Sequence, residues 1–271
     1  MDSSQPGGGQ PVVSVVVPVF EGRQTIRAAV ESALVNDVDL EVVVIDDGSS
    51  DPVRPSDLPA GPVRLITRPV NGGTALARND GISASKGKLI SFLDADDTFE
   101  PHRLDKAISV ILEEDVDGVV TDTLIVNFEG DRQLIRPKPD GSGFLGVRSP
   151  IIFASLIVRR DRLREVGLFD SGWPLQEDLA MWLSLLRSGC RMHPLEGATY
   201  LYRLRRSSKT LSARKVDRFW EFTRIYFSNA VRPGFSISDR LSLFNQTFRW
   251  GRWALLALWT SRRVTQGSES A

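Results

Sequence analysis

Three carboxylates are crowded into one short stretch of the chain. The stretch SFLDADDTF, Ser91 to Phe99, places Asp94, Asp96 and Asp97 directly after an apolar run. Negative charges this close raise one another's pKa unless a positive group lies among them. Mg²⁺ and Mn²⁺ take oxygen ligands and keep positions for water and phosphates, so Asp-x-Asp at the end of a strand suits such a cation. A solvated acidic loop before a helix is the alternative.

A second acidic pair opens an apolar helix. Glu177 and Asp178 stand at the start of a helix expected from about Gln176 to Ser188. A carboxylate that is held in position can act as a general base. The alternative is an ordinary helix N-terminus with an acidic first turn.

Alternating strand and helix patterns must position these carboxylates. Strands are expected at Val12 to Val19, Leu40 to Ile45, Val63 to Thr67 and Lys88 to Leu93. Helices are expected between and after them, at about Gln24 to Val35, Thr74 to Ser85 and Pro101 to Glu113. Apolar strands separated by helices predict an α/β protein with a Rossmann-like parallel sheet. Ligands bind beyond the carboxyl ends of such strands, so Asp46, Asp47 and the aspartates of SFLDADDTF should share one rim.

The second half of the chain has a less regular pattern. Strands are expected near Asp117 to Asn127, Pro150 to Arg159, Arg191 to Pro194 and Thr199 to Arg203. Two helical stretches follow, at about Val216 to Val231 and Ser238 to Ser261. No internal repeat is visible.

The composition of the chain indicates which partners it binds and in which compartment it works. Lys plus Arg equals Asp plus Glu at 34 each, which predicts no nucleic-acid partner. Residues 201–271 nevertheless hold 14 basic against 4 acidic side chains. A single cysteine, Cys190, fits a reducing compartment, and the start MDSSQPGGGQP indicates a disordered leader without a secretory signal. We therefore expect a cytoplasmic protein, which would lie at the inner face of the membrane if its C-terminal helices bind there.

Six segments, in order, resemble the inverting family 2 glycosyltransferases, which have a GT-A fold. They are SVVVPVFEG (14–22), EVVVIDDGSSD (41–51), NGGTALARNDGI (71–82), GKLISFLDADD (87–97), GLFDSGWPLQED (167–178) and YRLRRSS (202–208). The resemblance implies a nucleotide-binding half with a mixed sheet and a sugar transfer from a nucleotide-diphosphate sugar to an acceptor hydroxyl. It divides the chain into a leader (1–11), a catalytic domain (12–210, with halves 12–125 and 126–210) and a helical extension (211–271).

The resemblance also implies roles in donor binding. Asp46 or Asp47 would contact the nucleotide base, and Arg78 would steady the nucleotide. The backbone around Pro18 and Phe20, with Glu21 next to it, would line the same pocket. A surface ion pair is the alternative for Arg78.

The metal and the catalytic base are implied in the same way. Asp94 would face the ribose or the metal, Asp96 would ligate Mg²⁺ or Mn²⁺, and Asp97 would be a helper. The family places its base in the Glu177-Asp178 pair, and Asp178 is our choice. Attack opposite the leaving diphosphate then inverts the configuration of the sugar.

Two residues near the acceptor side carry open alternatives. Trp173 could stack on an acceptor ring or pack in the core. The family often has a His after its Tyr-Arg, whereas this chain has Leu204-Arg205-Arg206. Arg205, with Arg206 and Lys209, could bind phosphate by charge or form a solvated basic loop. The segment Phe128 to Pro150 is expected to contribute to acceptor choice.

The C-terminal stretch 239–263 combines aromatic and apolar residues with five arginines. Such a helix could lie on an anionic membrane surface, or its apolar side could cover the catalytic domain or a second subunit. Its longest apolar run, Trp253 to Trp259, is far below the roughly 20 residues of a spanning helix. The acceptor stays open between a glycan, a lipid-linked sugar and a small molecule.

Three other functions compete with sugar transfer. A nucleotide-sugar binding module would keep the donor contacts without transfer. A nucleotidyltransferase usually has a Gly-rich loop after the first strand, where PVFEGRQT has a single glycine. A phosphatase or receiver domain would place its Asp at the end of that strand, where the chain has Val19-Phe20-Glu21.

Overall fold

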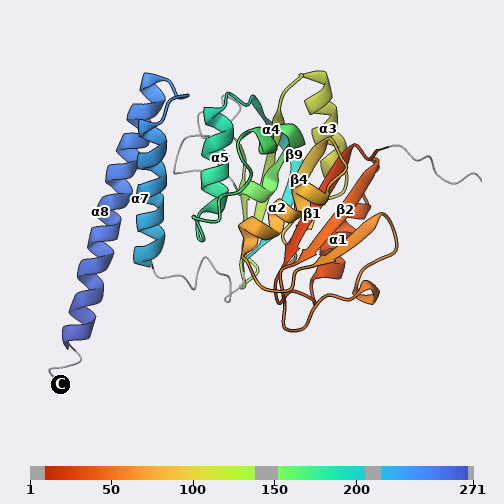
Figure 1. Ribbon diagram of the computed structural model, residues 1–271, viewed down its shortest axis with the longest axis horizontal. Coiled ribbons are helices and arrows are strands. Elements are labelled where there is room, and N and C mark those ends of the chain that lie inside the picture. Colours follow the sequence, from red (N-terminus) through yellow and green to blue (C-terminus); the bar gives the residue numbers. More distant parts are fainter. Residues whose placement is uncertain (1–9, 138–151, 205–214, 268–271) are drawn as a thin grey trace, which may run out of the picture.

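The structure, a computed structural model, describes residues 10–137, 152–204 and 215–267. Within these ranges one mixed sheet of nine strands has the order β3-β2-β1-β4-β8-β6-β9-β5, with β7 paired to β6 (Figure 1). The strands are β1 Val13–Val19, β2 Leu40–Asp46, β3 Val63–Thr67, β4 Leu89–Phe92, β5 Thr98–Phe99, β6 Gly118–Val126, β7 Arg132–Ile135, β8 Leu156–Arg159 and β9 Met192–Arg203.

The parallel part of the sheet brings two acidic strand ends together. β1 pairs in parallel with β2 on one side and β4 on the other. In this register Val19 lies opposite Asp46, and Val16 lies opposite Phe92, two residues before Asp94. The predicted parallel arrangement is confirmed, and both acidic segments leave the sheet at the carboxyl end of β1.

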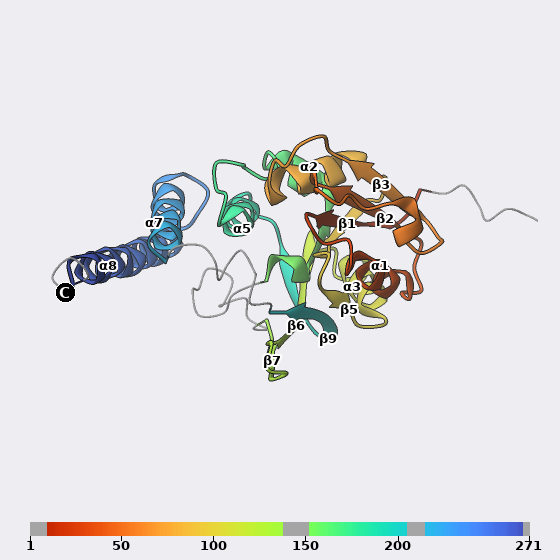
Figure 2. The ribbon, with the colours of Figure 1, turned by 90° about the horizontal axis from the view of Figure 1, so that it is seen from below.

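Helices cover both faces of this sheet. In Figure 2, α2 lies on one face while α1 and α3 lie on the other. The helices are α1 Ile26–Leu34, α2 Thr74–Ala84, α3 Arg103–Glu113, α4 Arg160–Glu165, α5 Glu177–Arg187, α7 Lys215–Val231 and α8 Ile237–Gly267, with 3-10 turns at Pro55–Asp57 and Phe153–Ser155. β1, β2 and β4 are almost wholly buried, and all seven residues of β2 are buried. Burial on both faces explains their near-continuous apolar sequence.

The structure differs from the predicted pattern at several places. β5, β7 and α4 were not expected, and β8 starts at Leu156 because a 3-10 turn precedes it. The two strand pieces expected around residues 191–203 form one strand, β9, interrupted by a bulge at Gly197, whose φ is 75°. α3 starts at Arg103 rather than Pro101, since His102 has a φ of 60°, outside the right-handed helical region.

The two predicted C-terminal helices are confirmed as α7 and α8. They stand beside α5, at the end of the molecule far from β2 (Figure 1). α5 and α7 share a small apolar core with α8, built around Leu183, Ile225, Tyr226 and Leu243. No helix among the described residues is long and apolar enough to cross a membrane.

Candidate active site

Asp46, at the end of β2, shapes the loop that follows it. The residue is fully buried, and its two carboxylate oxygens accept hydrogen bonds from the backbone N–H groups of Ser49 (3.0 Å) and Val53 (2.6 Å). Both acceptor atoms are therefore occupied inside the protein. Asp46 is placed to hold the loop rather than to face a ligand.

Asp47 joins β2 to the segment before α2. Its oxygens accept hydrogen bonds from the N–H groups of Gly72 (3.0 Å) and Gly73 (2.8 Å), and the carboxylate forms an ion pair with Arg68. Gly48 has a φ of 72°, and a Cβ there would lie 2.6 Å from the backbone nitrogen of Asn71. The loops after β2 and before α2 thus pack too closely for any other residue at position 48.

The residues at the end of β1 lie beside these loops. Pro18 belongs to β1, and Phe20 just beyond it keeps 53% of its surface exposed. The Glu21 carboxylate accepts hydrogen bonds from the Ser50 backbone N–H (2.7 Å) and hydroxyl (3.1 Å). An exposed aromatic ring is held in this way next to the rim.

Arg78, on α2, connects the aspartates after β4 with the start of α5. Its guanidinium donates to Asp94 Oδ1 (3.1 Å) and forms an ion pair with Asp178, 100 residues further along the chain. Its side chain is only 3% exposed, and three phenylalanine rings surround it with centroids 5.4 to 5.9 Å away. Burial disfavours the charge, but Asp178 and Asp94 together raise the pKa of Arg78 above its ordinary value.

Asp178 lies in the first turn of α5 and faces Arg78. Burial raises the pKa of Asp178 to about 7, Arg78 opposes this rise, and Glu177 and Asp94 add to it by repulsion. Its side chain stays 41% exposed, whereas Glu177 is buried. Of the two carboxylates, Asp178 is therefore the more accessible from solvent.

Asp97 is held by β9 through a partner that the sequence did not reveal. The Tyr200 hydroxyl donates to Asp97 Oδ2 (2.6 Å), and the backbone N–H of Arg203 donates to Oδ1 (2.7 Å). Burial, followed by repulsion from Asp94, raises the pKa of Asp97 to about 8. Tyr200 lies in β9, and the strand pattern around it in the sequence does not predict its hydrogen bond to Asp97.

Comparison with known proteins identifies the family. The model of the family "Glycosyl transferase family 2" matches residues 14–173, more than half of the chain. The chain belongs to glycosyltransferase family 2. The predicted membership of this family is thereby confirmed, and the first four of the six segments lie wholly within the matched residues.

Two relatives of this family 2 protein are named for succinoglycan biosynthesis. The succinoglycan biosynthesis protein ExoO of Rhizobium meliloti (strain 1021) is 33% identical over 218 residues, covering 73% of this chain and 62% of that protein. ExoU of the same organism is 31% identical, covering 78% and 68%. An uncharacterised glycosyltransferase of Rickettsia prowazekii is 28% identical, covering 65% and 59%. The chain spans about three fifths of the length of several such relatives.

Solved structures share the fold. S. aureus TarS 1-349 in complex with UDP-GlcNAc superposes with a TM-score of 0.71 at 20% identity, covering 88% of this chain and 72% of that one. TarS 1-349 in complex with UDP gives a TM-score of 0.68, also at 20% identity, covering 87% and 70%. The family 2 chain therefore has the GT-A fold, with a mixed sheet as predicted and a C-terminal helical extension.

The three aspartates after β4 fit a cation that takes few protein ligands. Among the described residues no group of three or more His, Cys, Asp or Glu side chains could hold a metal ion. Mg²⁺, however, is commonly bound through one or two carboxylates with water and substrate phosphates. Burial is the main cause of the raised pKa of Asp97, and repulsion from Asp94 and Asp96 adds to it; a cation nearby would offset that repulsion. Both oxygens of Asp97 already accept hydrogen bonds from the protein, which disfavours this residue as a metal ligand.

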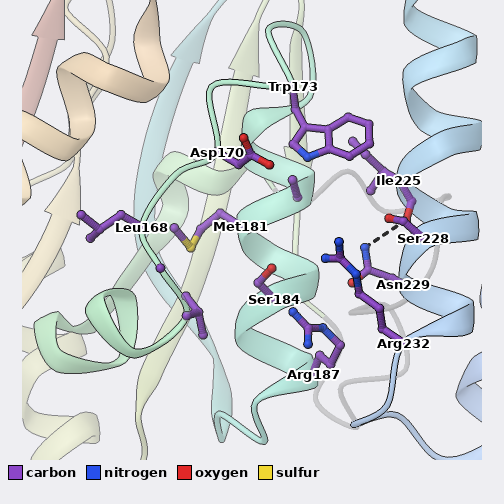
Figure 3. A pocket seen from close by; sticks show the side chains of 13 residues that line it. Leu168, Asp170, Trp173, Met181, Ser184, Arg187, Ile225, Ser228, Asn229 and Arg232 are labelled. Atoms are coloured by element: carbon purple, nitrogen blue, oxygen red, sulfur yellow. Dashed lines mark hydrogen bonds between the residues drawn. The ribbon is translucent and has the colours of Figure 1, made fainter.

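Trp173 lines a cavity away from these aspartates. Trp173, in the loop before α5, is half-buried, and the Arg224 guanidinium lies 5.0 Å from its ring centroid. The ring lines a cavity of about 290 Å³ between α5 and α7 (Figure 3). Arg205, Arg206 and Lys209, and positions 138–150 of the expected acceptor segment, lie outside the described residues.

Proposed function

We propose that this chain is a metal-dependent, inverting glycosyltransferase that moves a sugar from a nucleotide-diphosphate sugar to an acceptor hydroxyl. The observation that carries the proposal is the bridge of Arg78 between Asp94, at the rim where β1 and β4 end, and Asp178 on α5. Arg78 thereby holds Asp178, a carboxylate that can act as a general base, close to the rim of the sheet. That rim is where a nucleotide diphosphate is expected to bind.

In this proposal each residue has a separate task. Phe20 and the loops held by Asp46 and Asp47 accommodate the nucleotide. Asp178 accepts the proton of the attacking hydroxyl, and its pKa of about 7 suits that task near neutral pH. Arg78 keeps the Asp178 carboxylate facing the rim. A Mg²⁺ or Mn²⁺ ion held by Asp96 and Asp94 would supply positive charge beside the departing diphosphate.

Donor and acceptor follow as proposals from the relatives. The TarS structures contain UDP-GlcNAc or UDP, which supports a nucleotide-sugar donor for this chain. The names of ExoO and ExoU support an acceptor that belongs to a growing cell-surface glycan. A nucleotide-sugar binding module or a nucleotidyltransferase is the competing assignment, and the Asp178–Arg78 contact favours transfer, because pure binding needs no base.

A thermal-shift screen of nucleotide sugars with and without Mn²⁺ tests donor and metal together. A ligand at about 100 times its Kd should raise the Tm by about 5 to 10 °C, because it binds only the folded chain. Asp96→Ala should remove the Mn²⁺-dependent part of this shift. Asp37→Ala, at an exposed position before β2, removes the same charge far from the rim and should change nothing.

Two results would contradict this assignment. If no nucleotide sugar raises the Tm, the donor site is absent. If Asp96→Ala responds to Mn²⁺ as the unchanged protein does, the ion is held elsewhere.

We further propose that α7 and α8 rest on an anionic membrane surface at its cytoplasmic face. Seven of the fourteen exposed large hydrophobic side chains in the described residues belong to these two helices. Ile237, Leu241 and Phe248, which are 60 to 80% exposed, follow one line along α8. Arg249 and Arg252 are exposed beside that line. Apolar side chains flanked by arginines suit an interface rich in anionic lipid.

Flotation with lipid vesicles tests the membrane proposal. The protein should float with phosphatidylglycerol-containing vesicles and much less with pure phosphatidylcholine. Leu241→Ser combined with Phe248→Ser should lower vesicle affinity at least about tenfold, since each exposed side chain contributes on the order of 2 kcal/mol when buried. Leu112→Ser, 64% exposed on α3, is the matched control. A dimer in light scattering that this double variant abolishes, without flotation, would instead assign the surface to a second copy.

A further inference from the structure

The cavity between α5 and α7 is separate from the acidic rim. Its walls come from the loop before α5, from α5 and from α7 (Figure 3). Ala180, Ser184 and Arg187 face it at a spacing of four and three residues, which is one side of α5. Asp178 faces Arg78 instead, and neither residue lines the cavity. A ligand here would not occupy the donor site.

The cavity has an excess of positive charge. Arg187 and Arg232 line one end of it in the view of Figure 3, and Trp173 and Asp170 line the other. Among the described residues neither arginine has an ion-pair partner. Asp170 is the only acidic residue of the lining, and its Oδ1 accepts a hydrogen bond from the Gly172 N–H (2.8 Å). Two guanidinium groups thus remain available for an anion.

Two buried polar atoms of the residues that line the cavity have no hydrogen-bond partner, and one is a donor while the other is an acceptor. Arg187 Nε is buried without a hydrogen bond and needs an acceptor. Asn229 is 5% exposed; its Nδ2 donates to the Ile225 carbonyl (3.0 Å), while its Oδ1 has no partner and needs a donor. Buried polar groups are rarely left unpaired in folded proteins. A ligand with both an oxyanion and a hydroxyl would satisfy both atoms.

We propose that this cavity binds a small polyol or sugar that carries a phosphate or a carboxylate group. Arg187 and Arg232 bind the oxyanion of the ligand, and Asn229 Oδ1 accepts a hydrogen bond from one of its hydroxyl groups. The volume of about 290 Å³ is at the lower end of ligand pockets and suits a single monosaccharide. α5 carries Asp178 in its first turn and also forms one wall of the cavity. An acidic sugar bound in the cavity would therefore contact the same helix that carries the proposed base.

Isothermal titration calorimetry with glucose 6-phosphate, glucuronate, glucose and inorganic phosphate tests this site. At least one sugar anion should bind saturably and more tightly than glucose or phosphate. If glucose 6-phosphate binds more tightly than glucuronate, the oxyanion is a phosphate; the reverse order identifies a carboxylate. Arg232→Gln and Arg187→Gln should each weaken that binding at least about tenfold, because each removes a charge-assisted hydrogen bond.

The controls separate this site from the proposed function. Arg132→Gln, an exposed arginine on β7, loses the same charge and should bind the sugar anion normally. The donor-dependent thermal shift should be unchanged in Arg232→Gln, so failure of one proposal leaves the other standing. Arg232 is exposed, so this variant decides the matter even if Arg187→Gln does not fold. Absence of saturable binding by both sugar anions, or equal affinity in Arg232→Gln and the unchanged protein, overturns the proposal.

Discussion

The Asp178→Asn protein is expected to bind its nucleotide-sugar donor as tightly as the unchanged protein while kcat falls about a hundred- to ten-thousandfold, the usual contribution of a general base. The amide has nearly the shape of the carboxylate but cannot accept the proton of the acceptor hydroxyl. Donor binding should persist because Arg78 keeps its hydrogen bond to Asp94. Steady-state transfer rates and donor titration on the same preparation separate the two effects.

The pH dependence of transfer gives an independent readout of Asp178. Only the deprotonated form is a base, and the pKa of Asp178 is about 7, so kcat/KM should fall tenfold per pH unit below about pH 7. The residual activity of Asp178→Asn should lack this acid limb. Asp161→Asn is the matched control, since Asp161 also lies in the first turn of a helix, α4, away from the rim. Full transfer by Asp178→Asn would remove this residue from the mechanism.

The sequence was sufficient to predict the parallel part of the sheet. β1, β2 and β4 are buried on both faces, and that burial requires the continuous apolar runs from which they were predicted. The sequence was not sufficient for the short or exposed strands. β5 has two residues and β7 is largely exposed, so neither leaves a hydrophobic period. The bulge in β9 breaks the pattern at Gly197, so one strand was predicted as two.

The candidate site was predictable only where strand geometry dictates it. Asp46 and Asp94 follow from one edge of the sheet, because β2 and β4 both pair in parallel with β1 and parallel strands align their carboxyl ends. The contact of Arg78 with Asp178 joins residues 100 positions apart and depends on how α5 packs against the sheet. Tyr200 reaches Asp97 across 103 positions. Such contacts are set by tertiary packing, which no local period encodes.

The Arg78→Met protein is expected to lose transfer activity at neutral pH because the pKa of Asp178 rises. Arg78 lowers the pKa of Asp178, whereas burial, Glu177 and Asp94 raise it. Without the guanidinium only the raising influences remain, so the acid limb of kcat/KM should move from about pH 7 to higher pH. A loss in activity that is larger at pH 7 than at pH 9 follows. The pH profile of kcat/KM measures this displacement directly.

A control is needed because removal of a buried arginine also costs stability. Asp94 and Asp178 stay 31% and 41% exposed, so the free energy of unfolding should fall by only about 2 kcal/mol, less than for a fully buried pair. Arg162→Met, which removes an arginine paired with Asp117 and Glu165 away from the rim, should lower stability without moving the acid limb. Arg78→Lys keeps the charge but has no planar fork to bridge two carboxylates, so its limb should fall between the other two. An acid limb that is the same in Arg78→Met and the unchanged protein would show that Asp178 titrates independently of Arg78, and the base would then have to be sought elsewhere on the rim.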